Sequence, residues 1–294
     1  MDEHTINTEF AGFIPVLTTA AGSCLTSANW QEANVQTVSF HLMSLLLKPG
    51  YEVLKSLADL SAYTGWQHPY VLNATFPAVS RDGIYKFRSP YDGSHVSYTV
   101  NEILDLINHL QPALVILPQG IDTATTLQSL PSAILPFIPF NERAESPGVR
   151  PHGVYFNDDN NASLDSFLEY LAQHSHLPGY VAGNLSLPLM LELSSKGISY
   201  LESDQPAADA CLEHVYTNEG VISLLDINYA TQFEPIDNEC TCPTCAQQLT
   251  RAYLHHLLVQ TPLLCQRFLI QHNIHFTGTE LRKMKLRLTS FTPA

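Results

Sequence analysis

Short apolar runs rich in β-branched residues alternate along this chain with longer stretches in which apolar residues recur at helical spacing. The apolar runs lie at 13–18, 35–41, 70–76, 113–117, 153–156, 179–182, 197–201 and 221–227. The helical patterns include 52–60, 100–110, 162–173 and 187–195. A regular alternation of strand and helix predicts an α/β protein with a parallel sheet. Eight strands of this kind within 294 residues predict a TIM-like (β/α)8 barrel, a fold that typically takes about 250 residues.

One segment interrupts the alternation. Residues 118–151 are rich in Pro, Thr and Ser and, apart from a short apolar run at 134–140, have no clear period. We therefore expect a loop-rich crossover there. The whole chain, residues 1–294, is predicted to form a single barrel domain, because its length is that of one large α/β domain.

The charge and hydropathy of the chain restrict what it can bind. Its 28 acidic and 14 basic residues give a formal net charge of −14, which disfavours tight binding to nucleic acid by this chain alone. The basic segment 282–287 is a local exception, for which a solvated helix face is the alternative explanation. The sequence has no long apolar window, and its acidic start at Met1 does not resemble a signal peptide. We therefore expect a cytoplasmic protein without a membrane span.

Three of the six cysteines, Cys240, Cys242 and Cys245, are spaced too tightly for ordinary disulfide pairing but suitably for metal ligation. A helical pattern at 247–271 follows them and ends at His272, with His275 close behind. Three thiolates and one imidazole are the ligands of a closed structural zinc site. The sequence thus predicts a structural Zn2+ bound by Cys240, Cys242, Cys245 and His272, within a zinc-binding subdomain at about 237–276. His275 is the alternative fourth ligand, and free thiols in a surface loop are the alternative to a metal site.

These residues, together with others along the chain, resemble the tRNA-guanine transglycosylase family. Segments 240–245, 250–257 and 272–276 look like the zinc-and-helix signature of that family, including the accessory subunit of the eukaryotic queuine enzyme. Further similar segments occur in the family's order at 13–16, 40–42, 47–50, 65–66, 87–90, 92–94 and 179–185. The resemblance covers nearly the whole chain, which is shorter than typical members around 118–150 and 203–220. It implies a TIM-like barrel with a zinc subdomain near its end.

The resemblance also assigns two catalytic positions. The family exchanges guanine in the tRNA anticodon for a deazaguanine base through a covalent bond between the sugar and an aspartate. Such chemistry needs a carboxylate nucleophile and a second carboxylate that moves protons. By resemblance, Asn73 stands at the acid/base position, where an amide cannot take a proton, and Glu202 stands at the nucleophile position. The extra methylene of Glu202 would move the attacking oxygen by roughly 1 Å, enough to damage a positioned attack.

The positions that bind the base differ from the family pattern as well. By resemblance, Gln119, Phe156, Gly183 and Asn184 occupy substrate-binding positions, and of these only Gly183 keeps the family's residue. A buried polar group that loses its hydrogen-bond partner costs about 1–3 kcal/mol. The resemblance therefore implies weak binding of a purine-like base.

Three functional hypotheses follow from the resemblance and its departures. In the first, the chain is a catalytically impaired partner or accessory subunit in queuosine-type tRNA base modification. It would then be a homodimer, or a heterodimer with a complete transglycosylase, and would contact tRNA only weakly or indirectly. In the second hypothesis the chain is an active ribosyl-transferring enzyme that uses Glu202, and in the third it is a protein that binds a small ligand in the barrel. Whether the chain is an enzyme depends on which hypothesis holds.

Overall fold

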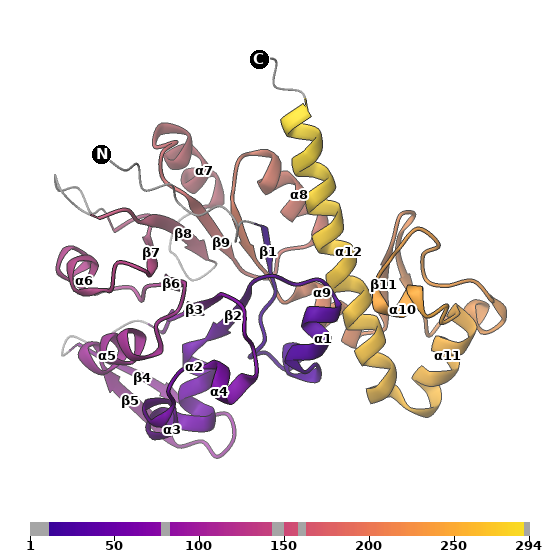
Figure 1. Ribbon diagram of the computed structural model, residues 1–294, viewed down its shortest axis with the longest axis horizontal. Coiled ribbons are helices and arrows are strands. Elements are labelled where there is room, and N and C mark those ends of the chain that lie inside the picture. Colours follow the sequence, from indigo (N-terminus) through magenta and orange to yellow (C-terminus); the bar gives the residue numbers. More distant parts are fainter. Residues whose placement is uncertain (1–11, 78–82, 143–149, 158–162, 291–294) are drawn as a thin grey trace. The chain divides into compact units, whose positions relative to one another are not determined.

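The computed structural model describes residues 12–77, 83–142, 150–157 and 163–290 (Figure 1). The chain divides into two compact units. Unit 1 comprises Met1–Gln36, Gly183–Gly197 and Leu201–Ala294, and unit 2 comprises Thr37–Ala182 and Ile198–Tyr200. That the chain forms a single domain with a zinc subdomain at about 237–276 stays a prediction.

The main sheet has eight strands. They are β1 (Gly12–Ile14), β2 (Val38–His41), β3 (Tyr70–Asn73), β6 (Leu114–Ile116), β7 (Leu135–Pro139), β8 (Gly153–Asn157), β9 (Gly179–Ala182) and β10 (Tyr200–Glu202). Their order in the sheet is β1-β10-β9-β8-β7-β6-β3-β2, and every neighbouring pair from β2 to β9 is parallel. The first strand therefore neighbours the last one, as in a (β/α)8 barrel and unlike an open doubly wound sheet. This order confirms the predicted TIM-like barrel class.

Aromatic side chains fill the inside of the sheet in unit 2. The ring centroid of Phe137 lies 5.2 Å from those of Tyr180 and Tyr200, and all three side chains are buried. The neighbouring strand carries Gly153, where a Cβ atom would lie only 2.3 Å from the Phe137 ring. The sheet thus encloses a packed core, in which this glycine makes room for a ring.

Unit 2 also contains six α-helices and a hairpin within its described residues. The helices are α2 (Leu42–Leu45), α3 (Tyr51–Ser56), α4 (Ser61–Thr64), α5 (Val100–Leu110), α6 (Thr123–Ser129) and α7 (Leu164–Gln173). A π-helical turn, η3 (Leu46–Gly50), joins α2 to α3, and β4 (Ile84–Arg88) pairs with β5 (His95–Thr99) in an antiparallel hairpin. Thr99 and Glu102 form a capping box that starts α5, where the sequence predicts a helix.

Strand β7 lies in the segment for which a loop-rich crossover is predicted, and that prediction is wrong at this point. Two prolines, Pro136 and Pro139, argue against a central strand, because proline cannot donate to the ladder. The register removes the conflict. The first residue pair between β7 and β8 is Phe137 with Gly153, so Pro136 lies before that ladder begins. The last residue pair between β7 and β6 is Phe137 with Ile116, so Pro139 lies after that ladder ends. Helix α6 occupies another part of the same segment, and residues 143–149 lie outside the described residues.

Unit 1 is built around one long helix, α12 (Pro262–Ser290), which is yellow in Figure 1. The other helices are α1 (Ser27–Glu32), α8 (Leu187–Ser195), α9 (Gln205–Cys211), α10 (Pro243–Ala246) and α11 (Arg251–Gln260), with short 3₁₀ turns η2 (Gly22–Cys24) and η4 (Ile227–Thr231). Helix α12 packs against each of these five α-helices and against β11 (His214–Thr217). It therefore contacts elements from all three chain segments of the unit.

Two expectations for unit 1 are wrong in detail. The run at 221–227 does not supply a barrel strand, because β12 (Gly220–Ser223) pairs with β11 in a separate two-stranded antiparallel sheet. The helix predicted at 247–271 is wrong, because two helices, α11 and α12, occupy this segment. Helix α11 ends where the backbone of Thr261 leaves helical geometry, and α12 begins at Pro262, since proline is favoured at the first position of a helix. His272 and His275 lie inside α12, which continues to Ser290. Among the described helices, none is long and apolar enough to cross a membrane.

Candidate metal centre and strand-end residues

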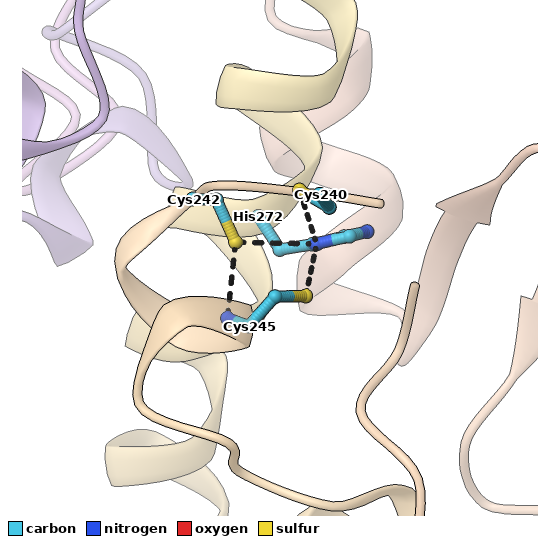
Figure 2. Close-up of side chains that lie close together, drawn as sticks. All are labelled: Cys240, Cys242, Cys245 and His272. Carbon is cyan, nitrogen blue, oxygen red and sulfur yellow. Dashed lines mark hydrogen bonds between the residues drawn. The ribbon is translucent and has the colours of Figure 1, made fainter. Parts of the chain in front are cut away.

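Cys240, Cys242, Cys245 and His272 come together in unit 1 (Figure 2). The three cysteines lie in the loop before α10 and in that helix, whereas His272 comes from α12. Their ligand atoms all lie within 4.8 Å of one another. Cys242, Cys245 and His272 are buried, and Cys240 is half-buried. One polar pocket made of three sulfurs and one imidazole is therefore enclosed by the surrounding chain.

The local sequence folds the loop around that pocket. Cys242 is the N-cap of α10, and its sulfur accepts a hydrogen bond from the backbone N–H of Cys245 at 3.3 Å. Pro243 follows at the first helical position, where its fixed φ suits the start of a helix. The hydroxyl of Thr244 donates to the carbonyl of Phe268 at 2.7 Å, which attaches the short helix to α12. These contacts hold two of the sulfurs beside the helix that carries His272.

The imidazole of His272 presents Nδ1 to the three sulfurs. The distances from Nδ1 are 3.7 Å to Cys240 Sγ and 3.4 Å to both Cys242 Sγ and Cys245 Sγ. A tetrahedral Zn2+ with Zn–S of about 2.3 Å and Zn–N of about 2.05 Å separates sulfur and nitrogen by about 3.6 Å. The other ring nitrogen, Nε2, lies 2.7 Å from the carbonyl of Tyr216, so Nε2 carries the proton. The unprotonated Nδ1 therefore directs its lone pair toward the sulfurs, as a metal ligand does. The residues present therefore fit a zinc ion.

Hydrogen bonding within the cluster, from Cys240 first and Cys245 second, lowers the pKa of Cys242 to about 3. These hydrogen bonds favour the thiolate form of Cys242. A bound cation would take over that stabilisation and favour thiolates at all three positions, since the thiolate is the form that ligates.

The alternative ligand His275 lies outside the group of four. Its Nε2 lies 3.3 Å from Thr241 Oγ1 and its Nδ1 lies 3.3 Å from the carbonyl of Ala33. Both ring nitrogens thus face oxygen atoms, which leaves the fourth ligand position to His272.

Three of the predicted substrate-site residues belong to unit 2. Asn73 is buried at the end of β3, and its Oδ1 accepts from the backbone N–H and the hydroxyl of Thr75 at 3.1 and 2.7 Å. Gln119 is half-buried shortly after β6, and its carbonyl accepts from the Tyr85 hydroxyl at 3.0 Å. Phe156 is buried in β8 with its ring 5.8 Å from that of Phe167 on α7. The Phe156 ring thus contacts a covering helix, and its role in binding stays a prediction.

The other three belong to unit 1. Glu202 ends β10 and is buried, with 2% of its surface exposed, and its carbonyl accepts from the backbone N–H of Gly183 at 3.2 Å. Asn184 is exposed. The next residue along the strand end, Ser203, both donates to the carbonyl and accepts from the N–H of Leu185 at 3.0 Å. Gly183 and Glu202 are therefore adjacent, and their catalytic or binding roles stay predictions.

The residue pattern does not reveal the groups that orient His272. The carbonyl of Tyr216 is a backbone group, which leaves no signal in the residue type. The side-chain oxygen of Asn273 accepts a hydrogen bond from the backbone N–H of the same tyrosine, Tyr216, at 3.0 Å. The only available signal was its position directly after a predicted ligand.

The strand order and the buried Cys3His cluster together define a (β/α)8 protein with a candidate metal centre close to its C-terminus. A family model described as queuine tRNA-ribosyltransferase matches residues 2–129 and 145–290. The chain therefore belongs to the queuine tRNA-ribosyltransferase family, the tRNA-guanine transglycosylases.

Individual relatives are distant in sequence but aligned over most of their length. The queuine tRNA-ribosyltransferases of Clostridium acetobutylicum, Thermotoga maritima and Treponema denticola are 23%, 24% and 24% identical to this chain. The alignments cover 93%, 95% and 90% of this chain and 87%, 87% and 82% of the relatives. The first alignment is 336 residues long, although this chain has 294, so that relative has residues without a counterpart here.

Proposed function

We propose that this chain is a catalytically impaired transglycosylase-like subunit in queuosine-type tRNA base modification, with a structural Zn2+ at its Cys3His cluster. The observation that carries the proposal is the side chain at position 73. Its amide oxygen is already an acceptor for two donors of Thr75, and an amide cannot take up or release a proton as a carboxylate does. The chemistry expected of the family therefore lacks its proton carrier at this position.

The zinc of this proposal is structural. All four ligand positions of a tetrahedral ion are taken by protein groups, which leaves no open position for water or substrate. When bound, the ion would supply folding free energy to unit 1. Cys240, Cys242, Cys245 and His272 would hold it, and the Tyr216 carbonyl would keep the proton of His272 on Nε2.

An assay of base exchange tests the catalytic part. Purified chain, labelled guanine and tRNA should give no incorporation, while a complete transglycosylase in a parallel reaction serves as positive control. Incorporation that disappears in Glu202→Gln would contradict the proposal and establish the alternative, an active enzyme that uses Glu202. Incorporation that persists in Glu202→Gln would point to contamination by another transglycosylase.

Pairing with a second subunit is the other part of the proposal, either as a homodimer or with a complete transglycosylase. Exposed apolar side chains gather on η4, the segment after it and α11, which pack together. They are Ile227, Phe233, Tyr253 and Val259, and the first two have 73% and 76% of their surface exposed. A specific dimer buries at least about 1,000 Å² around an apolar centre, and this surface is the candidate for it. The net charge of −14 favours a protein partner over direct, tight contact with tRNA.

Size-exclusion chromatography with light scattering tests the pairing, first on the chain alone and then mixed with a complete transglycosylase. Phe233→Glu should weaken the association, whereas Tyr63→Glu, at an exposed aromatic residue of unit 2, should leave it unchanged. A chain that stays monomeric in both experiments at tens of micromolar would contradict the subunit proposal and favour the small-ligand alternative. The proposed site of action is the cytoplasm, where the unpaired cysteines of the described chain remain reduced.

A further inference from the structure

Asn273 follows the candidate ligand His272 on α12, and none of its surface is exposed. Its Oδ1 accepts from the backbone N–H of Tyr216 at 3.0 Å. Its Nδ2 donates to the carbonyls of Pro206 at 3.0 Å and His214 at 2.9 Å. Both N–H groups and the oxygen of this carboxamide therefore form hydrogen bonds to backbone groups, two of them in β11 and one in α9.

Tyr216 connects this side chain to the metal centre. The peptide groups on its two sides are held by consecutive residues of α12, because Asn273 accepts from its N–H and His272 donates to its carbonyl at 2.7 Å. Figure 2 shows the His272 ring with one nitrogen toward the sulfurs and the other away from them. A shift of Tyr216 would release the second nitrogen and allow the ring to rotate or change tautomer.

We propose that Asn273 is a positioning residue for the metal centre. By fixing β11 against α12 it keeps the Tyr216 carbonyl in place, and that carbonyl keeps the proton on Nε2 and the lone pair of Nδ1 directed at the thiolates. Loss of a group that is hydrogen-bonded directly to a metal ligand typically changes metal affinity by about 10- to 100-fold, and Asn273 holds such a group, the Tyr216 peptide, in place. The inference rests on the zinc ion of the proposed function and is independent of whether the chain is catalytically impaired.

The same network reaches the helix that follows Glu202. The hydroxyl of Tyr216 donates to Asp209 of α9 at 2.6 Å, and Asn273 holds the carbonyl of Pro206 in the first turn of that helix. Helix α9 starts three residues after Glu202, at Gln205. The metal centre and this helix are therefore joined through one buried carboxamide and one tyrosine.

Zinc affinity measured by competition with a chromophoric chelator tests the proposal on the full chain. Asn273→Leu keeps the approximate size of the side chain and removes all three hydrogen bonds, and its zinc dissociation constant should rise about 10- to 100-fold. Thr277→Val is the matched control. Thr277 lies one turn further along α12, is equally buried, and its hydroxyl has no hydrogen-bond partner in the described chain. That variant should bind zinc as the wild type does.

Two further readouts separate orientation of the ligand from general stability. The absorption spectrum of the Co2+-substituted chain reports the ligand set directly, and it should change in Asn273→Leu but not in Thr277→Val. If Asn273→Leu does not fold, amide hydrogen exchange on the wild type replaces it. Removing zinc should then speed exchange at the Tyr216 N–H and within α9 more than within α8, which also packs on α12 and which a general loss of stability would affect equally.

The outcomes distinguish the two proposals. A wild-type chain that binds no zinc overturns the metal centre itself. A wild type that binds zinc, with unchanged affinity and Co2+ spectrum in Asn273→Leu, overturns only the role of Asn273. So does exchange at the Tyr216 N–H that zinc removal speeds no more than it speeds exchange within α8.

Discussion

Replacing Cys242 by serine removes one candidate zinc ligand while leaving the local helix start intact. The sulfur of Cys242 accepts the Cys245 N–H as the N-cap of α10, and serine is among the preferred N-cap residues. The three sulfur-to-nitrogen distances, 3.4 to 3.7 Å, are those of a tetrahedral zinc site with three sulfur ligands and one nitrogen ligand. Any large effect of Cys242→Ser is therefore expected to come from the metal.

The size of that effect follows from the energetics of structural zinc. Such sites bind with about 10–16 kcal/mol of apparent free energy at neutral pH, and one of four comparable ligands contributes roughly 3–4 kcal/mol. Zinc affinity should thus fall by two to three orders of magnitude. A loss of roughly 3 kcal/mol is a large part of the 5–15 kcal/mol that stabilises a typical protein, and it lowers the melting temperature by about 6 °C or more.

Elemental analysis and thermal unfolding, each with and without a chelator, measure both quantities. The wild type purified without added metal should contain about one zinc per chain, and the chelator should lower its melting temperature. Cys265→Ser is the control, because Cys265 is fully buried on α12, donates to the Leu254 carbonyl at 3.4 Å and lies outside the cluster. A wild type that is metal-free, or that melts identically with and without chelator, would contradict a structural zinc site.

Two predictions concern unit 2. Gly153→Ala should destabilise the chain by about 3 kcal/mol or more, because its Cβ would lie 2.3 Å from the Phe137 ring, and more than Gly179→Ala, whose Cβ meets the flexible end of a leucine. Equal denaturation midpoints of these two variants would contradict the packing argument. Thr99→Ala should cost about 0.5–2 kcal/mol at pH 7 through loss of the capping box. Hydrogen bonds from the backbone N–H of Thr99, and secondly from its hydroxyl, lower the pKa of Glu102 in the folded chain. The stabilisation from these bonds is therefore present above the ordinary pKa of about 4.3 and is lost as the pH falls through the lower pKa of the folded chain. Thr99→Ala keeps the backbone N–H and removes only the hydroxyl that donates to Glu102. Urea unfolding at pH 7 and pH 3 should therefore show the gap between wild type and Thr99→Ala narrowing by the share of the hydroxyl, and a constant gap would contradict a charged hydrogen bond between that hydroxyl and Glu102.

The parts of the fold that the sequence predicts correctly are those specified by neighbouring residues. Helix α5 is one case, because the residues of its capping box and of its apolar face all lie within 99–110 and can be recognised there. Strand β7 is the opposite case. Its prolines are acceptable only because β6 and β8 begin and end where they do, which no local pattern reveals.

The candidate site divides in the same way. The spacing of the three cysteines requires one tight loop, and the structure brings them to the predicted His272. The hydrogen bond from His272 to Tyr216 joins residues that are 56 positions apart and uses a backbone carbonyl, so residue types alone could not predict it. For Asn73 and Glu202 the sequence shows which chemical group each side chain carries. Their roles also depend on the substrate, which the residue types do not reveal.

The distribution of unit 1 along the chain has a consequence for the order of events during synthesis. Unit 1 joins the first 36 residues to segments that begin at Gly183 and Leu201, whereas nearly all of unit 2 is one continuous stretch. Since α12 contacts every other described α-helix of unit 1 and carries the last candidate ligand, the growing chain can close the candidate metal centre only after α12 has left the ribosome. Until then the cysteines at 240–245 are open to oxidants and to other metals.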